Sequence, residues 1–526
     1  MCKTSFGNSR RSGVRPLGCA VALGFVLAMS SLWAAEGSPR PNFVVFITDD
    51  ESALERRAYG WSDLPTPNFE RVAREGVLFT RAYCSAPSCA PARAALLTGR
   101  NFWELEQGAF IQAFLPAKFP LLPHLLEAAG YRTGYTGKGA SPYQSASRFG
   151  AAAAKGAESA KLATGPQYNQ IKHQQSEDSG DTIDYAANLR AFLEEDKKSQ
   201  PFWFWVGVND PHAPFSPDNP EKLAAKHGIN LDQVTLPGFL PDTPGLRRQR
   251  ATFIYELLRA DETLGKVLAV LEEKGQLDNT FFIVTSDNGT WYPPHGKAGP
   301  YEWGSHVPLA IRWPAKVKPG RKVTDFVGFP DLAPTMLEAA KVPVPSSMSG
   351  RSLLPILLSD QSGQVDPSRS FMVTGLEWHG ELPPNNRAFR AIRDEGYAYI
   401  RNYGRGFVYP VNEQADTEFE KTAATASVLP DLVTKHPHHP TLKSFAPRII
   451  EESPAEELYD LIEDPWQLRN LAGDPAHAKT KERLEKQMTD YQRLTGDPRV
   501  TGEMKIFEAT RAKVVETKKS GYKGGE

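Results

Sequence analysis

A near-continuous apolar stretch close to the start of the chain constrains the fold more than any other segment. Residues 42–48 read Asn-Phe-Val-Val-Phe-Ile-Thr and lead directly into two aspartates. An apolar run of this length is typical of a central parallel strand that is buried on both faces. The same pattern returns in three later runs, at 202–208, 280–285 and 307–313.

Helical patterns alternate with these apolar runs. Amphipathic stretches lie at 66–75 and 121–129, and a longer helical pattern extends from about 248 to 274. Glycines at 130 and 275 close two of them, as expected at helix ends. The alternation predicts an α/β fold with a doubly wound, mostly parallel central sheet and helices on both faces.

The length of the chain predicts more than one domain. Single hydrophobic cores stop growing beyond about 250–300 residues, and this chain has 526. After about residue 365 the elements become shorter, which predicts a smaller α+β domain with an antiparallel sheet and a helix around 476–495. We therefore expect a large domain over 40–365, a C-terminal subdomain over 366–500 and a solvated, lysine-rich tail over 501–526.

The first 35 residues have the order of a secretory signal peptide. Basic residues up to Arg15 precede an apolar run from Leu17 to Trp33, which is followed by Ala34-Ala35. This order predicts a cleaved signal and a periplasmic or secreted protein. Ser9-Arg10-Arg11 weakly resembles a twin-arginine signal, although Gly13 occupies a position where that motif has an aromatic residue.

The remaining composition excludes two classes of partner. Lys plus Arg number 61 against 62 for Asp plus Glu, so no global positive field favours nucleic acid. No other segment approaches 18 continuous apolar residues, so we expect no membrane span in the mature chain.

Polar residues follow two of the predicted strands at their carboxyl ends. Asp49 and Asp50 follow the first strand, and Asp287 and Asn288 follow the strand at 280–285. Parallel strands bring such ends to one edge of a sheet, where ligands bind. Three carboxylates and an amide oxygen suit Ca²⁺ or Mg²⁺. Each pair taken alone is equally typical of a helix cap or a turn.

A cysteine motif identifies a nucleophile candidate. The chain reads Cys89-Ala90-Pro91-Ala92-Arg93, then Leu97-Thr98-Gly99-Arg100. One interpretation is a small buried thiol before a helix with proline in its first turn. However, the motif resembles the signature of the type I sulfatases. In that family the cysteine is oxidised to Cα-formylglycine, and the aldehyde hydrate attacks sulfur.

The resemblance implies roles for further residues, with 40–365 as the catalytic domain. The positions that match the metal ligands of the family are Asp49, Asp50, Cys89, Asp287 and Asn288. The positions that match its catalytic residues are Cys89, Arg93, Lys138, His212 and Lys297. Fixed cations stabilise the negative charge that develops on a transferring sulfuryl group. Arg93 and Arg100 are expected to orient the hydrate, which a formylglycine-generating enzyme must first produce from Cys89.

Two positions depart from the family pattern. Family members usually carry a histidine two residues beyond the lysine matched by Lys138, but this chain has Ala140 there. The base that regenerates the aldehyde must then come from elsewhere, and the candidates are His212, His295 and His306. Ala92 also replaces the commoner serine of the signature.

The two cysteines that remain after signal cleavage allow two interpretations that exclude each other. In an exported protein a pair such as Cys84 and Cys89 predicts a disulfide. If Cys89 is converted to an aldehyde, that bridge cannot form, and Cys84 stays a free, buried thiol.

The resemblance covers most of the mature chain and is closest to the N-sulphoglucosamine sulphohydrolase (heparan N-sulfatase)-like branch. It rests on stretches 121–138, 287–308 and 389–402 and on the closing segment at 457–472. The implied substrate is a sulfated saccharide, bearing an N-sulfate or an O-sulfate. Two alternatives remain open: a phosphatase or phosphodiesterase of the same superfamily, and a non-catalytic glycan-binding protein on this scaffold.

Aromatic and polar residues are the candidates for sugar contacts. Those expected near the cleft are Trp103, Trp291, Tyr292, Trp303, Trp378, His379, Asn385 and Asn386. The alternative interpretation is that at least half of the tryptophans only pack in the core.

Overall fold

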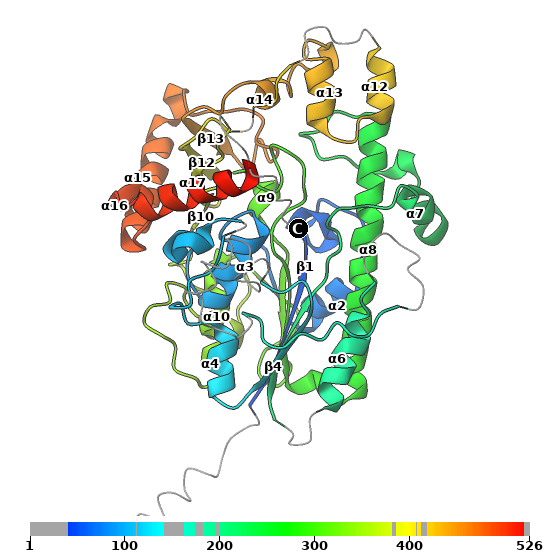
Figure 1. Ribbon diagram of the computed structural model, residues 1–526, viewed down its shortest axis with the longest axis vertical. Helices are drawn as coiled ribbons and strands as arrows, with labels where there is room; N and C mark the ends of the chain where they lie inside the picture. Colours follow the sequence, from blue (N-terminus) through cyan, green and yellow to red (C-terminus); the bar gives the residue numbers. More distant parts are fainter. Residues whose placement is uncertain are drawn as a thin grey trace, which may run out of the picture. The chain divides into compact units, whose positions relative to one another are not determined.

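A seven-stranded sheet forms the centre of the fold, and β1 (Asn42–Thr48) is an inner strand, third in the spatial order (Figure 1). β1 pairs in parallel with β5 and β6 on its two sides, and every β1 residue is buried. β7 is antiparallel to both of its neighbours, β6 and β2, so the sheet is mostly parallel. In spatial order the strands are β4 (Arg132–Gly137), β5 (Phe202–Gly207), β1, β6 (Thr280–Ser286), β7 (Leu309–Arg312), β2 (Val77–Phe79) and β8 (Arg321–Val323).

Helices cover both faces of this sheet, as the alternation in the sequence predicts. Phe43, Val45 and Ile47 belong to the hydrophobic cluster on one face, and Val44 and Phe46 belong to the cluster on the other. The first cluster includes residues of α3 (Cys89–Thr98), α4 (Leu122–Ala128) and α10 (Leu332–Ala339). The second includes residues of α2 (Pro67–Glu75), α6 (Tyr185–Glu194) and α8 (Pro244–Glu273). The predicted doubly wound α/β architecture is confirmed.

A second, antiparallel sheet follows the main sheet along the chain, and its prediction is also confirmed. Its strands are β10 (Met372–Leu376), β11 (Phe389–Arg393), β12 (Tyr397–Asn402) and β13 (Glu456–Asp460), and α15 (Ala478–Leu494) packs on it. The hydrophobic cluster of this sheet includes Phe102 and Trp103 from the N-terminal half. From Pro41 onward the chain therefore forms one unit of packed elements.

Shorter elements complete the described structure. They are β3 (Ala82–Tyr83), β9 (Val327–Gly328), α7 (Asn219–His227), α9 (Glu302–Ser305), α11 (Leu354–Leu358), α12 (Phe419–Thr425), α13 (Leu429–Lys435), α14 (Pro447–Ile450), α16 (Pro498–Thr501) and α17 (Lys505–Lys519).

The computed structural model describes residues 40–111, 113–140, 163–173, 182–195, 200–380, 385–406, 408–411 and 418–519. The predicted signal peptide at 1–35 lies outside these residues. No helix within the described ranges has the length and the apolar character that crossing a membrane requires.

The expectation of a solvated tail is wrong for residues 505–519. These residues form α17, and Phe507 and Val514 are buried in the cluster of the second sheet. The ring of Phe507 meets the ring of Phe110 edge-on, with centroids 5.5 Å apart. The lysine-rich composition suggested a solvated segment, but Phe507 and Val514 are seven residues apart and therefore lie on one face of a helix.

We predict that Phe507→Ala lowers the free energy of unfolding by about 3 kcal/mol, because it removes a buried ring that packs on Phe110. Ile506→Ala is the matched control, since Ile506 is exposed, and it should cost less than about 0.5 kcal/mol. Urea denaturation measures both changes. Equal, small effects of the two substitutions would contradict the docking of α17.

Candidate active site

The register of the central sheet brings the predicted metal ligands together. Thr48 at the end of β1 pairs with Ser286 at the end of β6, so the residues that follow these two strands are neighbours. Asn288 donates from Nδ2 to Asp50 Oδ1 at 2.7 Å, and the backbone N–H of Asp50 donates to Asp287 Oδ1 at 3.2 Å. Asp49, Asp50, Asp287 and Asn288 are all buried.

These residues fit a hard cation. Asn288 Oδ1 is buried and accepts no hydrogen bond from any described residue. Ligand atoms of Asp49, Asp50, Cys89 and His212 all lie within 4.8 Å of one another. A carboxylate-rich set with a free amide oxygen suits Ca²⁺ or Mg²⁺ better than a soft metal.

Cys89 begins α3 and faces this cluster. Its Sγ lies 3.6 Å from Asp49 Oδ1, and the residue is buried. Burial raises the pKa of the thiol to about 12, although Lys138 and Lys297 oppose the shift. Unmodified Cys89 is therefore protonated near neutral pH and is a poor nucleophile as it stands.

Three cationic side chains balance the three carboxylates. Lys297 Nζ lies 2.8 Å from Asp50 Oδ1, and Lys138 Nζ contacts Asp49 Oδ2. Arg93 donates from Nε to Asp287 Oδ2 at 2.8 Å and from Nη1 to the carbonyl of Lys138 at 2.8 Å. Its Nη2 has no hydrogen-bond partner in the described part of the chain. Burial alone would raise the pKa of Asp49, but Lys138, His212 and Arg93 hold it well below its usual value.

The close approach of β4 and β5 sets the position of Lys138. Gly137 has a φ of +77°, and a Cβ there would lie 2.1 Å from the carbonyl oxygen of Gly207. The backbone N–H of Lys138 then donates to that same oxygen at 2.8 Å. Only glycine fits this contact, because both the space and the left-handed conformation exclude a side chain.

The loop that carries His212 is held by a pair that the sequence did not suggest. His212 Nε2 lies 3.7 Å from Asp50 Oδ2. Arg259 on α8 donates from Nε and Nη2 to the two carboxylate oxygens of Asp210, at 2.7 and 2.6 Å, and the carbonyl of Asp210 accepts from the N–H of Asp49. No motif marks Arg259, because its partner lies 49 residues away.

Three of the predicted residues lie away from the cluster. Arg100 is past the far end of α3, where it pairs with Glu104 at 3.7 Å and covers the ring of Phe119, so its expected role is wrong. His306 Nε2 lies 3.0 Å from the carbonyl of Thr80. His295 stacks on Phe239 and Tyr301. Among the three candidate bases, only His212 lies within ion-pair distance of a carboxylate of the cluster, that of Asp50.

Most of the predicted sugar-contacting aromatics are core residues. Trp103, Tyr292, Trp303 and Trp378 are buried in hydrophobic clusters, so the packing interpretation holds for them. Trp291 and His379 are only partly buried, and their ring centroids lie 5.9 Å apart. His379 Nδ1 lies 2.9 Å from the hydroxyl of Ser88, the residue before Cys89.

Asn385 and Asn386 pair with the backbone of their own loop region. Asn385 Nδ2 donates to the carbonyl of Val408 at 3.4 Å, and Asn386 Oδ1 accepts from the N–H of Ala388 at 3.0 Å. These contacts do not place either side chain beside Cys89.

Both described cysteines are free thiols. Cys84 is buried, and its Sγ lies 3.9 Å from the carbonyl of Gly304. The structure therefore contains no Cys84–Cys89 disulfide, in agreement with the prediction of a free, buried Cys84.

Comparisons with known proteins give a consistent result. A family model described as Sulfatase matches residues 41–342, and one described as N-sulphoglucosamine sulphohydrolase, C-terminal, matches residues 295–419. The chain is 28% identical to the N-sulphoglucosamine sulphohydrolase of Homo sapiens, with 89% of this chain and 93% of that protein covered. It is 25% identical to an ulvan-active sulfatase of Formosa agariphila, with 93% and 90% covered.

Solved structures share the fold at lower identity. A protein in complex with its substrate D-glucosamine-2-N,6-O-disulfate has a TM-score of 0.60 and 20% identity, covering 87% of this chain and 98% of that one. A phosphonate monoester hydrolase of Agrobacterium radiobacter also has a TM-score of 0.60 and 20% identity, covering 87% and 96%. The fold alone therefore does not distinguish sulfate from phosphonate ester chemistry.

Proposed function

The chain belongs to the sulfatase family, and from this premise we propose that it removes sulfate from a sulfated glycan through a formylglycine at position 89. The observation that carries the proposal is the setting of Cys89. Its side chain faces Asp49 among three cations, at the edge of the sheet where substrates of α/β enzymes bind.

In the proposed reaction, residue 89 acts as the hydrated aldehyde. One of its hydroxyls attacks sulfur, and the sulfur–oxygen or sulfur–nitrogen bond to the sugar breaks. The second hydroxyl then gives up its proton, the sulfate leaves and the aldehyde is restored. Because an aldehyde hydrate carries two hydroxyls, the intermediate breaks down without attack by an external water on sulfur.

The side chains of this site divide the remaining tasks. Lys138 and Lys297 stabilise the charge on the sulfuryl oxygens, and Arg93 Nη2, which has no hydrogen-bond partner among the described residues and lies 3.9 Å from Asp49 Oδ1, orients the nucleophile. His212, partly exposed beside Asp50, protonates the leaving oxygen or nitrogen. A divalent cation held by Asp49, Asp50, Asp287 and Asn288 would supply Lewis-acid polarisation of the nucleophile and the sulfate.

The substrate proposal comes from the relatives. The similarity to N-sulphoglucosamine sulphohydrolase covers 89% of this chain, and the match to the C-terminal model of that family covers residues 295–419. N-sulfoglucosamine is therefore the first substrate to test, and O-sulfated saccharides are the second. We further propose that the predicted signal peptide exports the protein to the periplasm or the medium, where such glycans occur.

Neither alternative function accounts for the site as well. A phosphatase of this fold would use a serine or threonine nucleophile, but Cys89 occupies the nucleophile position. A non-catalytic glycan-binding protein would not need three buried carboxylates matched by three cations, two of which, Arg93 and Lys297, are also buried, since such groups are costly to bury.

We predict sulfate release from N-sulfoglucosamine or O-sulfated saccharides in a screen that also includes aryl sulfates and phosphate monoesters. Cys89→Ala should lower turnover by at least about 10³-fold, because it removes the nucleophile. Cys84→Ala is the matched control and should retain activity, since the buried Cys84 thiol contacts the carbonyl of Gly304 and hydrogen-bonds none of the carboxylates. Turnover restricted to phosphate esters, or full activity of Cys89→Ala, would refute the proposal.

We also predict one bound Ca²⁺ or Mg²⁺ per chain, measured by elemental analysis of the purified protein. Chelation should abolish activity and lower Tm, and added Ca²⁺ or Mg²⁺ should restore both, because a ligand that binds only the folded state stabilises it. Asp287→Ala should lose the ion, whereas Asp278→Ala should keep it, since Asp278 is 92% exposed. Zinc in its place, or full activity after exhaustive chelation, would show that the assignment is wrong.

A further inference from the structure

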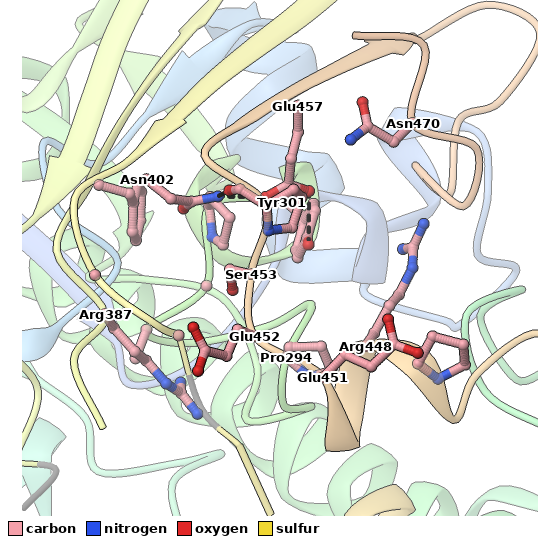
Figure 2. Close-up of a pocket in the computed structure, with 18 of the residues that line it drawn as sticks. Pro294, Tyr301, Arg387, Asn402, Arg448, Glu451, Glu452, Ser453, Glu457 and Asn470 are labelled. Carbon is pink, nitrogen blue, oxygen red and sulfur yellow. Dashed lines mark hydrogen bonds between the residues drawn. The ribbon is translucent and has the colours of Figure 1, made fainter. Parts of the chain in front are cut away.

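A cavity is lined by the residue that follows Lys297 of the candidate active site. It has a volume of about 230 Å³ and lies between the segment 294–301, the ends of β11 and β12, and α14 with the residues that follow it. In Figure 2, Arg387 and Arg448 lie on opposite sides of this cavity, and Tyr301 and Glu457 lie above them in the view.

One short segment connects the cavity to the catalytic groups. Lys297 directs its Nζ to Asp50, while the next residue, Ala298, lines the cavity. The backbone N–H of Ala298 donates to the carbonyl of Pro87 at 2.7 Å, two residues before Cys89. The cavity therefore lies one layer of residues from the nucleophile segment.

A second connection passes through partly exposed aromatic rings. Arg387 lines the cavity, and its guanidinium carbon lies 5.9 Å from the centre of the Trp291 ring. Trp291 in turn lies next to His379, which contacts Ser88. Arg387, Trp291 and His379 thus form a chain of contacts from the lining of the cavity to the residue before Cys89.

The charge of Arg448 has no acidic partner in the described ranges. Its Nη1 donates to His295 Nε2 at 2.6 Å, and its guanidinium carbon lies 5.8 Å from the centres of the Tyr301 and Tyr459 rings. His295 accepts this bond and is therefore neutral there; burial and Arg448 lower its pKa well below the usual value. No carboxylate of a described residue lies within ion-pair distance of Arg448.

The acidic residues of the cavity differ in availability. Glu457 is buried, and its carboxylate accepts from Tyr301 at 3.0 Å, Tyr459 at 2.5 Å and Asn402 at 2.7 Å. Glu452 pairs with Arg405 at 2.5 Å. Glu451 is exposed at the rim. Glu457 is thus already held by three donors, and Arg448 faces the cavity without a carboxylate partner among the described residues, which suits an anionic sugar.

We propose that this cavity binds the sugar next to the sulfated one, and that this neighbour carries a carboxylate or sulfate that pairs with Arg448. The inference rests on the proposed function and extends it from a sulfated monosaccharide to an acidic glycan. A charge-assisted, two-pronged contact of arginine with a carboxylate or sulfate supplies both affinity and orientation.

The test compares three substrates: the sulfated monosaccharide of the screen, the same sugar joined to a uronic acid, and the same sugar joined to a neutral hexose. We expect Arg448→Gln to lower kcat/KM about tenfold or more for the uronic-acid disaccharide and less than twofold for the other two. Glu451→Gln should raise kcat/KM for the acidic disaccharide two- to threefold at low salt, because it removes a like charge from the rim. Glu463→Gln, on an exposed turn, is the control and should change nothing.

The outcomes separate the inference from the function. Loss of activity on all three substrates in Arg448→Gln would show a structural role through His295 and overturn the inference, as would no change on any. Binding of the desulfated acidic disaccharide, followed by calorimetry, gives a readout that needs no turnover: wild type should bind it and Arg448→Gln should not. If no sulfated sugar is hydrolysed by wild type, the proposed function fails separately.

Discussion

The balance between buried charges at one edge of the central sheet is the constraint on which the rest of the site depends. Three carboxylates, Asp49, Asp50 and Asp287, meet three cations, Arg93, Lys138 and Lys297. Each charge would be costly in the interior without its partner. The set is close to neutral, so a divalent cation would leave the site positive toward an anionic sulfate. The nucleophile candidate Cys89 faces this set.

The fold supplies these charges from separate parts of the chain. The register of β1 and β6 fixes the aspartates, α3 brings Arg93, the end of β4 brings Lys138, and a loop after β6 brings Lys297. All of these positions lie at the carboxyl ends of strands or in the loops that follow them, where α/β sheets bind ligands. Helix α8 adds a further support, because Arg259 holds the Asp210 loop that carries His212.

Much of this arrangement follows from local sequence patterns. The apolar run 42–48 is a strand over those same residues, and the long helical pattern ending near Gly275 is α8. The clustering of Asp49, Asp50, Asp287 and Asn288 follows from strand ends that share an edge. By contrast, Arg259 and Ser88 carry no local signal, since their importance arises only from contacts across the fold. Arg100 and four of the aromatic residues were wrongly expected near the active site, because the type of a residue does not show where it packs in the fold. Helix α17 was not predicted, because its lysines outnumber its two buried apolar residues.

The mass of residue 89 in active protein tests the central claim most directly. Trypsin releases residues 82–93 as one peptide that contains both Cys84 and Cys89. Across preparations with different degrees of conversion, specific activity should rise in proportion to the fraction of this peptide that carries an aldehyde at position 89. Cys84, on the same peptide, should remain an alkylatable thiol in every preparation. Full activity in a sample whose residue 89 is entirely thiol would contradict the account.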